Sequence, residues 1–172
     1  MVASIRLRSA LFAVFAATPA LAQQADPIAA IRADDWSDAQ RAAASYADPV
    51  ANKLVTYYRL LTPGAATADE ISAFMAQSPD WPNQALLERR RQEAIATDPD
   101  LASTLAQCDH NQLTVPQTML HCAEALANAG RNAEAAEEAR RAWIAGVGDE
   151  PDFLRRWAGA VRPDDTWERF ER

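Results

Sequence analysis

The residues best suited to chemistry are two cysteines and two histidines, arranged as Cys108-x-His110 and His121-Cys122. Such side chains can bind zinc, but adjacent helical residues diverge by about 100°, so His121 and Cys122 suit a shared ion poorly. A disulfide between Cys108 and Cys122, with both histidines at the surface, accounts for the same residues. Whether the two Cα atoms approach within bridging distance stays open. We expect no metal and no cofactor.

The side chains that could act in catalysis do not lie within the sequence motifs that activate them. No Gly-x-Ser-x-Gly segment or Cys–His signature is present, and the five glycines are scattered rather than gathered in a phosphate-binding loop. Carboxylates such as Glu134, Glu137 and Glu138 share segments with arginines at helical spacing, which predicts paired charges on a solvated helix face. We therefore expect no catalytic residue.

The one basic run is Arg89-Arg90-Arg91. It is a candidate contact for an anion or a glycan. On a helix these side chains point about 100° apart, so at least one stem is expected to pack over the core while others reach solvent. Aromatic side chains such as Trp81 and Trp143 could stack on sugars, but their helical spacing favours the core.

Composition excludes several classes of partner. The formal net charge is −7, and Lys53 is the single lysine, so the chain lacks the basic footprint of a nucleic-acid or anionic-membrane binder. Hydrophobic residues make up 49% of the sequence, which is enough for a packed core and argues against extensive disorder.

Residues 1–22 have the three-part pattern of a secretory signal peptide. Arg6 and Arg8 precede a short apolar run, and Ala20-Leu21-Ala22 places small residues where a signal peptidase cleaves. The run is shorter than the roughly 20 residues that span a bilayer. We expect cleavage after Ala22, a periplasmic product without a membrane span, and one domain over residues 23–172.

The remaining sequence predicts an all-α fold. Helix formers dominate it, and no segment alternates with the period of a strand. Asp-Pro pairs at 26–27, 48–49 and 98–99 and the Thr67–Glu70 capping box mark helix starts. One expected buried stripe contains Val50, Leu54, Tyr57, Tyr58 and Leu61. We predict helices at about 27–33, 35–46, 49–61, 67–77, 83–97, 99–107, 115–129, 132–145, 150–161 and 164–171.

Short helices with short connections favour an α-solenoid, a superhelix of antiparallel hairpins. The clearest hairpin runs from Leu120 to Trp143 around a turn at Gly130-Arg131. Alanines on both predicted helices allow close approach. This segment looks like a tetratricopeptide hairpin, although no strict repeat of that length runs through the chain.

Four segments together follow a familiar order and spacing: Asp34-Asp35-Trp36 with Lys53-Leu54-Val55-x-Tyr57-x-Arg59-Leu60; Ile71-x-x-Phe74 through Pro79-Asp80-Trp81-Pro82; the hairpin around Gly130-Arg131; and Arg162-Pro163-Asp164-Asp165-x-Trp167-x-Arg169. They resemble the N-terminal superhelical domain of soluble lytic murein transglycosylases over about residues 28–172. The Pro79–Pro82 element is among the most specific parts.

The resemblance implies a periplasmic α-superhelix from enzymes that cleave peptidoglycan glycan strands and leave an anhydro end. In that family a separate C-terminal domain carries the catalytic glutamate in a Glu-Ser context, and this sequence contains no Glu-Ser dipeptide. We therefore expect a non-catalytic scaffold module that contacts peptidoglycan or a cell-wall enzyme. The alternatives are a tetratricopeptide-like adaptor that binds a protein, or a truncated product without independent function.

Overall fold

A computed structural model describes residues 26–108 and 112–171, and within these ranges the protein is all-α, with no strand. The predicted signal peptide lies outside the described residues. The α-helices are α1 (Pro27–Arg32), α2 (Trp36–Ala44), α3 (Pro49–Leu61), α4 (Ala68–Gln77), α5 (Gln84–Ala96), α6 (Leu101–Gln107), α7 (Pro116–Asn128), α8 (Asn132–Ala145), α9 (Glu150–Trp157) and α10 (Pro163–Phe170), and a short 3-10 helix covers Ala158–Ala160.

The helix starts follow from their capping residues. Asp26 and Asp48 each accept a hydrogen bond from the backbone N–H of the second residue of the following helix, at 2.9 and 2.8 Å, and Thr67 forms its reciprocal capping box with Glu70. The prediction at Asp98-Pro99 was wrong by two residues. Asp100 caps α6 through the N–H of Ala102, because the Asp98 carboxylate instead accepts from the N–H of Asp100.

The turn between α7 and α8 is built on a left-handed glycine. Gly130 has φ +76°, a conformation that side chains with a Cβ disfavour. Its N–H donates to the Ala127 carbonyl, and the N–H of Arg131 donates to the Leu126 carbonyl at 2.9 Å. This pair of bonds is the Schellman motif, and it reverses the chain so that α7 and α8 pack side by side.

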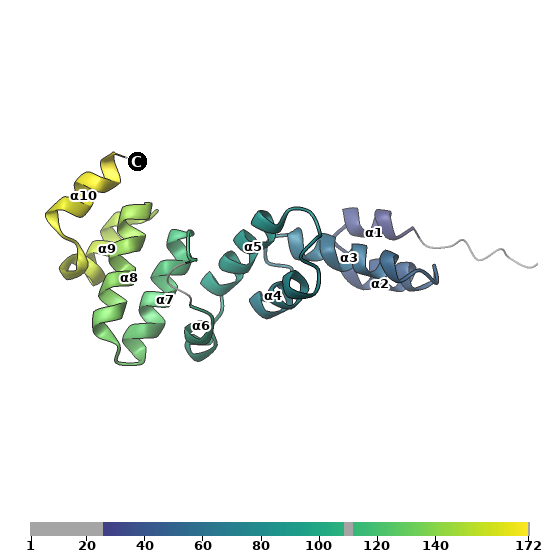
Figure 1. Cartoon of the computed structure of the whole chain (residues 1–172), viewed down its shortest axis with the longest axis horizontal. Helices are drawn as coiled ribbons and strands as arrows, with labels where there is room; N and C mark the ends of the chain where they lie inside the picture. The colour runs from purple at the N-terminus through teal and green to yellow at the C-terminus, as the bar shows by residue number, and fades with distance from the viewer. Residues whose placement is uncertain (1–25, 109–111, 172) are drawn as a thin grey trace, which may run out of the picture.

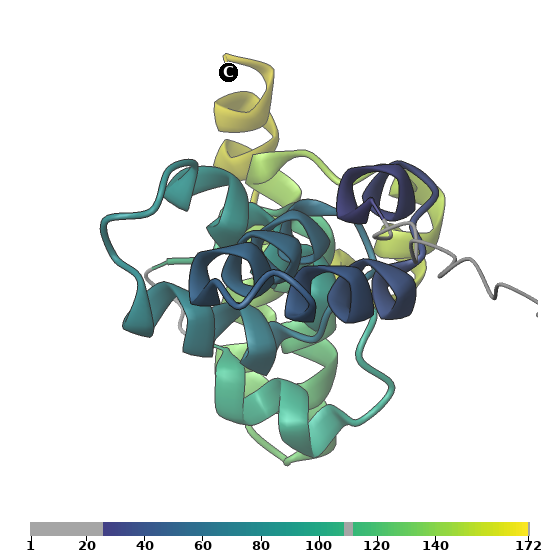
Figure 2. The same cartoon turned by 90° about the vertical axis from the view of Figure 1, so that its right-hand side faces the viewer.

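Chain order and spatial order agree along the long axis of the molecule (Figure 1). The helices run from α1 at one end to α10 at the other, and contacts join near neighbours in the sequence. Viewed along that axis, α10 projects beyond the other helices (Figure 2). This is the open arrangement expected of stacked hairpins, while the tetratricopeptide-like superhelix stays a prediction.

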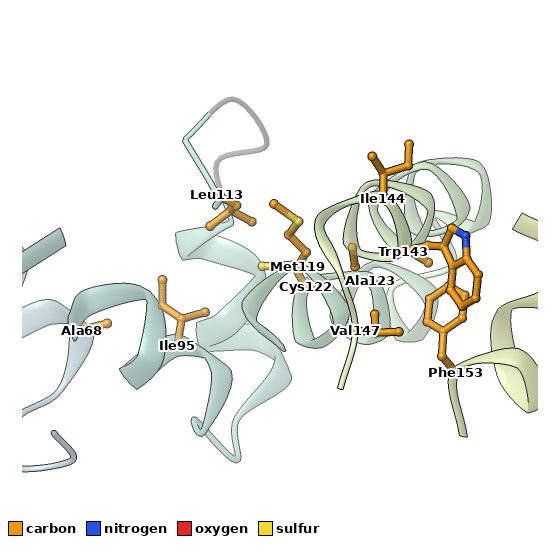
Figure 3. Packing of buried hydrophobic residues seen from close by; sticks show 12 residues of the cluster. Ala68, Ile95, Leu113, Met119, Cys122, Ala123, Trp143, Ile144, Val147 and Phe153 are labelled. Carbon is orange, nitrogen blue, oxygen red and sulfur yellow. The ribbon is translucent and has the colours of Figure 1, made fainter. Parts of the chain in front are cut away.

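The core is divided into three clusters along this axis. The first joins α2 and α3 through Ala39, Ala43 and Val55. The second joins α3, α4 and α5. The third and largest lies mainly between α7, α8 and α9 (Figure 3). The buried members of the second cluster are Tyr57, Leu60, Ile71, Phe74 and Leu87.

Two members of the predicted stripe on α3 are not buried. Val50 is 59% exposed and Tyr58 is 42% exposed, so their placement in the core was wrong. Val50 lies in the first turn of its helix, and the Tyr58 side chain leaves the helix about 100° away from that of the buried Tyr57. The hydrophobic pattern gave the right helix but too wide a buried face.

Candidate functional site

Two polar hollows of about 460 and 530 Å³ lie along α5, α7 and α8, and Thr114 lines both. We call the two hollows together the Thr114 groove. Its first hollow is lined by Ala85, Glu88, Arg89, Gln92, Thr114, Val115, Pro116 and Gln117, and its second by Leu113, Thr114, Met119, Glu137, Arg140, Arg141, Ile144, Ala145 and Glu168.

Gln92 on α5 holds the middle of the groove in place. It is only 1% exposed. Its side-chain oxygen accepts from the backbone N–H groups of Thr114 and Val115 at 2.8 and 3.0 Å. Its amide nitrogen donates to Glu88 and to the Gln112 carbonyl at 2.9 and 3.1 Å. One buried amide thereby ties the segment before α7 to α5.

The hydroxyl of Thr118 adds a further bond between these helices. This buried side chain donates to the backbone carbonyl of Gln92 at 2.8 Å. Sequence reasoning did not single out Gln92. The available signal was its position three residues before Ile95, on a face of α5 where a polar residue must find partners when it is buried.

The second hollow is bordered by a network of arginines and carboxylates. Arg140 on α8 donates to Glu137 at 2.7 Å and to Asp165 of α10 at 2.7 Å. Asp165 also accepts from the N–H of Arg162 at 2.7 Å. Arg141 pairs with the buried Glu138 at 2.9 Å. These bonds fix α10 against α8.

Two carboxylates of this network, Glu137 and Asp165, have a pKa below the ordinary value. Hydrogen bonding from Arg140 lowers the pKa of Glu137, and burial offsets this only in part. Burial acts to raise the pKa of Asp165, but the Arg162 N–H and the Arg140 guanidinium outweigh it and lower the pKa. Hydrogen bonds to Glu137 and Asp165 in turn raise the pKa of Arg140.

The first hollow shows the same balance. Burial of Glu88 acts to raise its pKa, but hydrogen bonds from Arg91 and Gln92 outweigh it, and the pKa falls. A general acid works best with a pKa near the operating pH. Glu88 and Glu137 are therefore suited to accepting hydrogen bonds from a polar ligand rather than to donating a proton.

The three predicted contact arginines do not face one ligand together. Arg89 lines the groove and is 68% exposed, and it pairs with Glu93 at 3.0 Å. Arg90 donates to the Leu61 carbonyl at 2.8 Å and also pairs with Glu93. Arg91 pairs with Glu88 at 2.6 Å. Each guanidinium is thus in an ion pair on its own helix, and of the three only Arg89 reaches the groove.

Cys108 and Cys122 are joined in a disulfide, with Cα atoms 5.9 Å apart. The bond ties the end of α6 to the middle of α7. The His121 side chain instead contacts the backbone near α6, where its Nε2 lies 2.7 Å from the Asp98 carbonyl oxygen. His110 lies outside the described residues. Over the described ranges, no three His, Cys, Asp or Glu side chains gather as metal ligands.

The aromatic residues quoted for the family resemblance lie mostly in packing positions. Trp81 contacts Tyr57 and Phe74 with centroids 5.1 and 5.4 Å away, and Lys53 Nζ lies 5.0 Å from the centre of the Trp81 ring. The Tyr57 hydroxyl donates to the Pro82 carbonyl at 3.2 Å. The Pro79–Pro82 element therefore closes the second core cluster.

Fold and groove together define a class: an all-α array of packed helices with a polar groove across several of them. No protein-family model matches the chain, and neither a curated protein nor a solved structure matches it. No helix in the described part of the chain is long and apolar enough to cross a membrane.

Proposed function

We propose that this protein is a non-catalytic α-superhelical scaffold module of the lytic murein transglycosylase kind, which holds peptidoglycan glycan along the Thr114 groove. The observation that carries the proposal is the groove itself. It is lined by residues of α5, α7 and α8, and it offers both donors and acceptors. Curved arrays of helical pairs use extended surfaces of this kind to bind extended ligands. The four sequence segments described above add the peptidoglycan context.

We propose that the module works in the periplasm. Residues 1–22 support export, and the Cys108–Cys122 disulfide fits an oxidising compartment. Mass spectrometry of protein recovered from a periplasmic fraction should give a chain that begins at Gln23 and carries no free thiol. A retained Met1, or two free thiols in freshly isolated protein, would contradict this proposal.

Binding is tested by co-sedimentation of the purified protein with intact peptidoglycan sacculi. We expect saturable binding without release of anhydro-muropeptides into the supernatant. Release of such products would overturn the non-catalytic assignment. Retention of a defined periplasmic protein, with no retention of sacculi, would favour the adaptor alternative instead.

The groove is tested by removing polar side chains that line it without supporting the core. In a double variant, Arg89→Ala with Gln117→Ala, both altered residues are exposed. The loss of two or more ligand hydrogen bonds should weaken sacculus binding roughly tenfold. Arg155→Ala is the matched control, because Arg155 is 70% exposed and lies outside the groove. Equal binding by the unaltered protein, the double variant and the Arg155→Ala control would rule out the Thr114 groove as the binding surface.

A further inference from the structure

The α10 end of the array carries an exposed aromatic pair. The rings of Trp167 and Phe170 stack with centroids 5.7 Å apart, yet the two residues are 63% and 81% exposed. They lie on the helix that projects from the array (Figure 2). Large aromatic side chains supply most of their binding energy when they are covered, so an exposed stacked pair marks a contact surface.

A hollow of about 390 Å³ adjoins this pair where α8, the start of α9 and α10 meet. Phe170 is a member of the aromatic pair and also lines the hollow. Arg169 is held in the hollow by its contact with the Trp143 ring, whose centre lies 4.3 Å from the guanidinium carbon, and by donation to Glu150 at 2.5 Å. The hollow is lined by Trp143, Glu150, Thr166, Arg169 and Phe170.

Two N–H donors of these lining residues have no acceptor. Trp143 Nε1 and Arg169 Nη1 are both buried without a hydrogen-bond partner, and Trp143 as a whole is only 5% exposed. Its ring packs on Phe153, with centroids 5.1 Å apart (Figure 3). Buried donors without acceptors are rare in folded proteins and cost free energy. A ligand oxygen that enters the hollow would recover the missing hydrogen bonds.

We propose that the hollow and the Trp167–Phe170 pair form a saccharide-binding site, here called the α10 aromatic site. A pyranose ring presents an apolar C–H face to the aromatic rings, and its oxygens accept from the N–H groups of Trp143 and Arg169. A purely apolar partner would cover the rings but leave both donors unpaired. Both residues that carry these donors line the hollow.

This inference rests on the proposed function and deepens it, because it names a second place at which a glycan is held. The site is separate from the Thr114 groove, since no residue lines both. Glu150 and Thr166 complete the lining with a carboxylate acceptor and a hydroxyl. A mixed lining with a few convergent polar groups is typical of small-molecule sites.

The test is isothermal titration of the purified protein with a soluble trimer of β-1,4-linked N-acetylglucosamine. We expect Trp167→Ala and Phe170→Ala each to weaken binding at least about fivefold, through lost stacking. Tyr46→Ala is the matched control, because Tyr46 is an aromatic residue that is 42% exposed near the other end of the array. It should bind as the unaltered protein does.

A second variant isolates the buried donor. Trp143→Phe keeps an aromatic ring for Phe153 and Arg169 but removes Nε1–H. We expect affinity to fall about fivefold, with the helical circular-dichroism spectrum unchanged. A Trp143→Phe protein with full affinity would overturn the hydrogen-bonding part of the site.

Other outcomes would overturn the site as a whole. One is equal affinity of the Trp167, Phe170 and Tyr46 variants for the trimer. Another is sedimentation velocity that shows association between copies through the aromatic pair, without saccharide binding. If sacculi bind but the trimer does not, the α10 aromatic site is refuted and the proposed function stands. If the trimer binds but sacculi do not, the proposed function is refuted and the α10 aromatic site stands.

Discussion

At the residue scale, the buried amide of Gln92 is the most consequential polar side chain of the groove. Both of its polar atoms are used, and two backbone N–H groups depend on its oxygen. Leucine has a similar volume but would leave the Thr114 and Val115 N–H groups without an acceptor. A buried donor that loses its partner costs about 1–3 kcal/mol.

We therefore expect Gln92→Leu to lower the free energy of unfolding by about 2–4 kcal/mol. Urea denaturation followed by circular dichroism measures this change. Gln77→Leu is the control, because Gln77 is exposed at the end of α4, and its stability should change little. A Gln92→Leu protein as stable as this control would show that the segment before α7 does not need the buried amide.

The buried carboxylate of Asp165 makes stability depend on pH. Its folded-state pKa is lowered, so the ionised form is the one that the fold favours. Its contribution is complete above the unfolded-state pKa of about 3.9, and it is lost as the pH falls through the lower folded-state pKa. The loss therefore occurs in acid rather than near neutrality.

Asp165→Asn should cost about 3 kcal/mol at pH 7, because it removes the buried carboxylate that pairs with Arg140 and leaves Glu137 as the partner of this guanidinium. The difference in unfolding free energy from the unaltered protein should stay constant down to about pH 5 and close below about pH 4. Asp164→Asn, at the exposed neighbouring position, provides the comparison. A difference that grows as the pH falls would contradict this linkage.

At the element scale, the disulfide restrains the short helix α6 against α7. The two cysteines are 14 residues apart, and closing a loop of this size stabilises a fold by about 3 kcal/mol on the chain-entropy model. A protein with Cys108→Ala and Cys122→Ala should lose about that much in urea denaturation. Dithiothreitol should destabilise the unaltered protein to a similar degree and leave the double variant unchanged. An effect of the reductant on the double variant would point to a cause other than this bond.

At the scale of the whole molecule, stability should differ along the array. The cluster between α2 and α3 contains two alanines and a valine, whereas the cluster around α7 and α8 buries larger side chains such as Met119, Trp143 and Phe153. In arrays where each unit contacts near neighbours, local stability follows the local core. The N-terminal helices should therefore open first.

Native-state hydrogen exchange measures this gradient. We expect backbone amides of α7 and α8 to exchange at least about tenfold more slowly than those of α1 and α2. Reduction of the disulfide should narrow this difference in exchange rate, because it removes a restraint between α6 and α7 and none at α1 or α2. Equal protection at both ends would mean that the array unfolds as one cooperative unit.

The sequence alone determined the helical elements. Asp-Pro pairs, the Thr67 capping box and Gly130 are local signals, because a cap or a turn requires only residues within one helical turn of it. Together with the helix-forming composition and the hydrophobic pattern, they placed helices at the positions of all ten α-helices in the described ranges. The error at Asp98 arose because Asp98 and Asp100 both suit a cap, and pattern alone does not choose between them.

Only the tertiary structure decided the groove and the α10 aromatic site. Gln92 meets Thr114 across 22 residues, and Arg140 meets Asp165 across 25. No periodicity within a helix encodes such pairings. The exposure of Val50 and Tyr58 was likewise settled by which neighbours are present, since a hydrophobic stripe shows where burial is favourable and packing decides whether it happens. Local sequence thus fixed the elements, and contacts between distant segments fixed the surfaces.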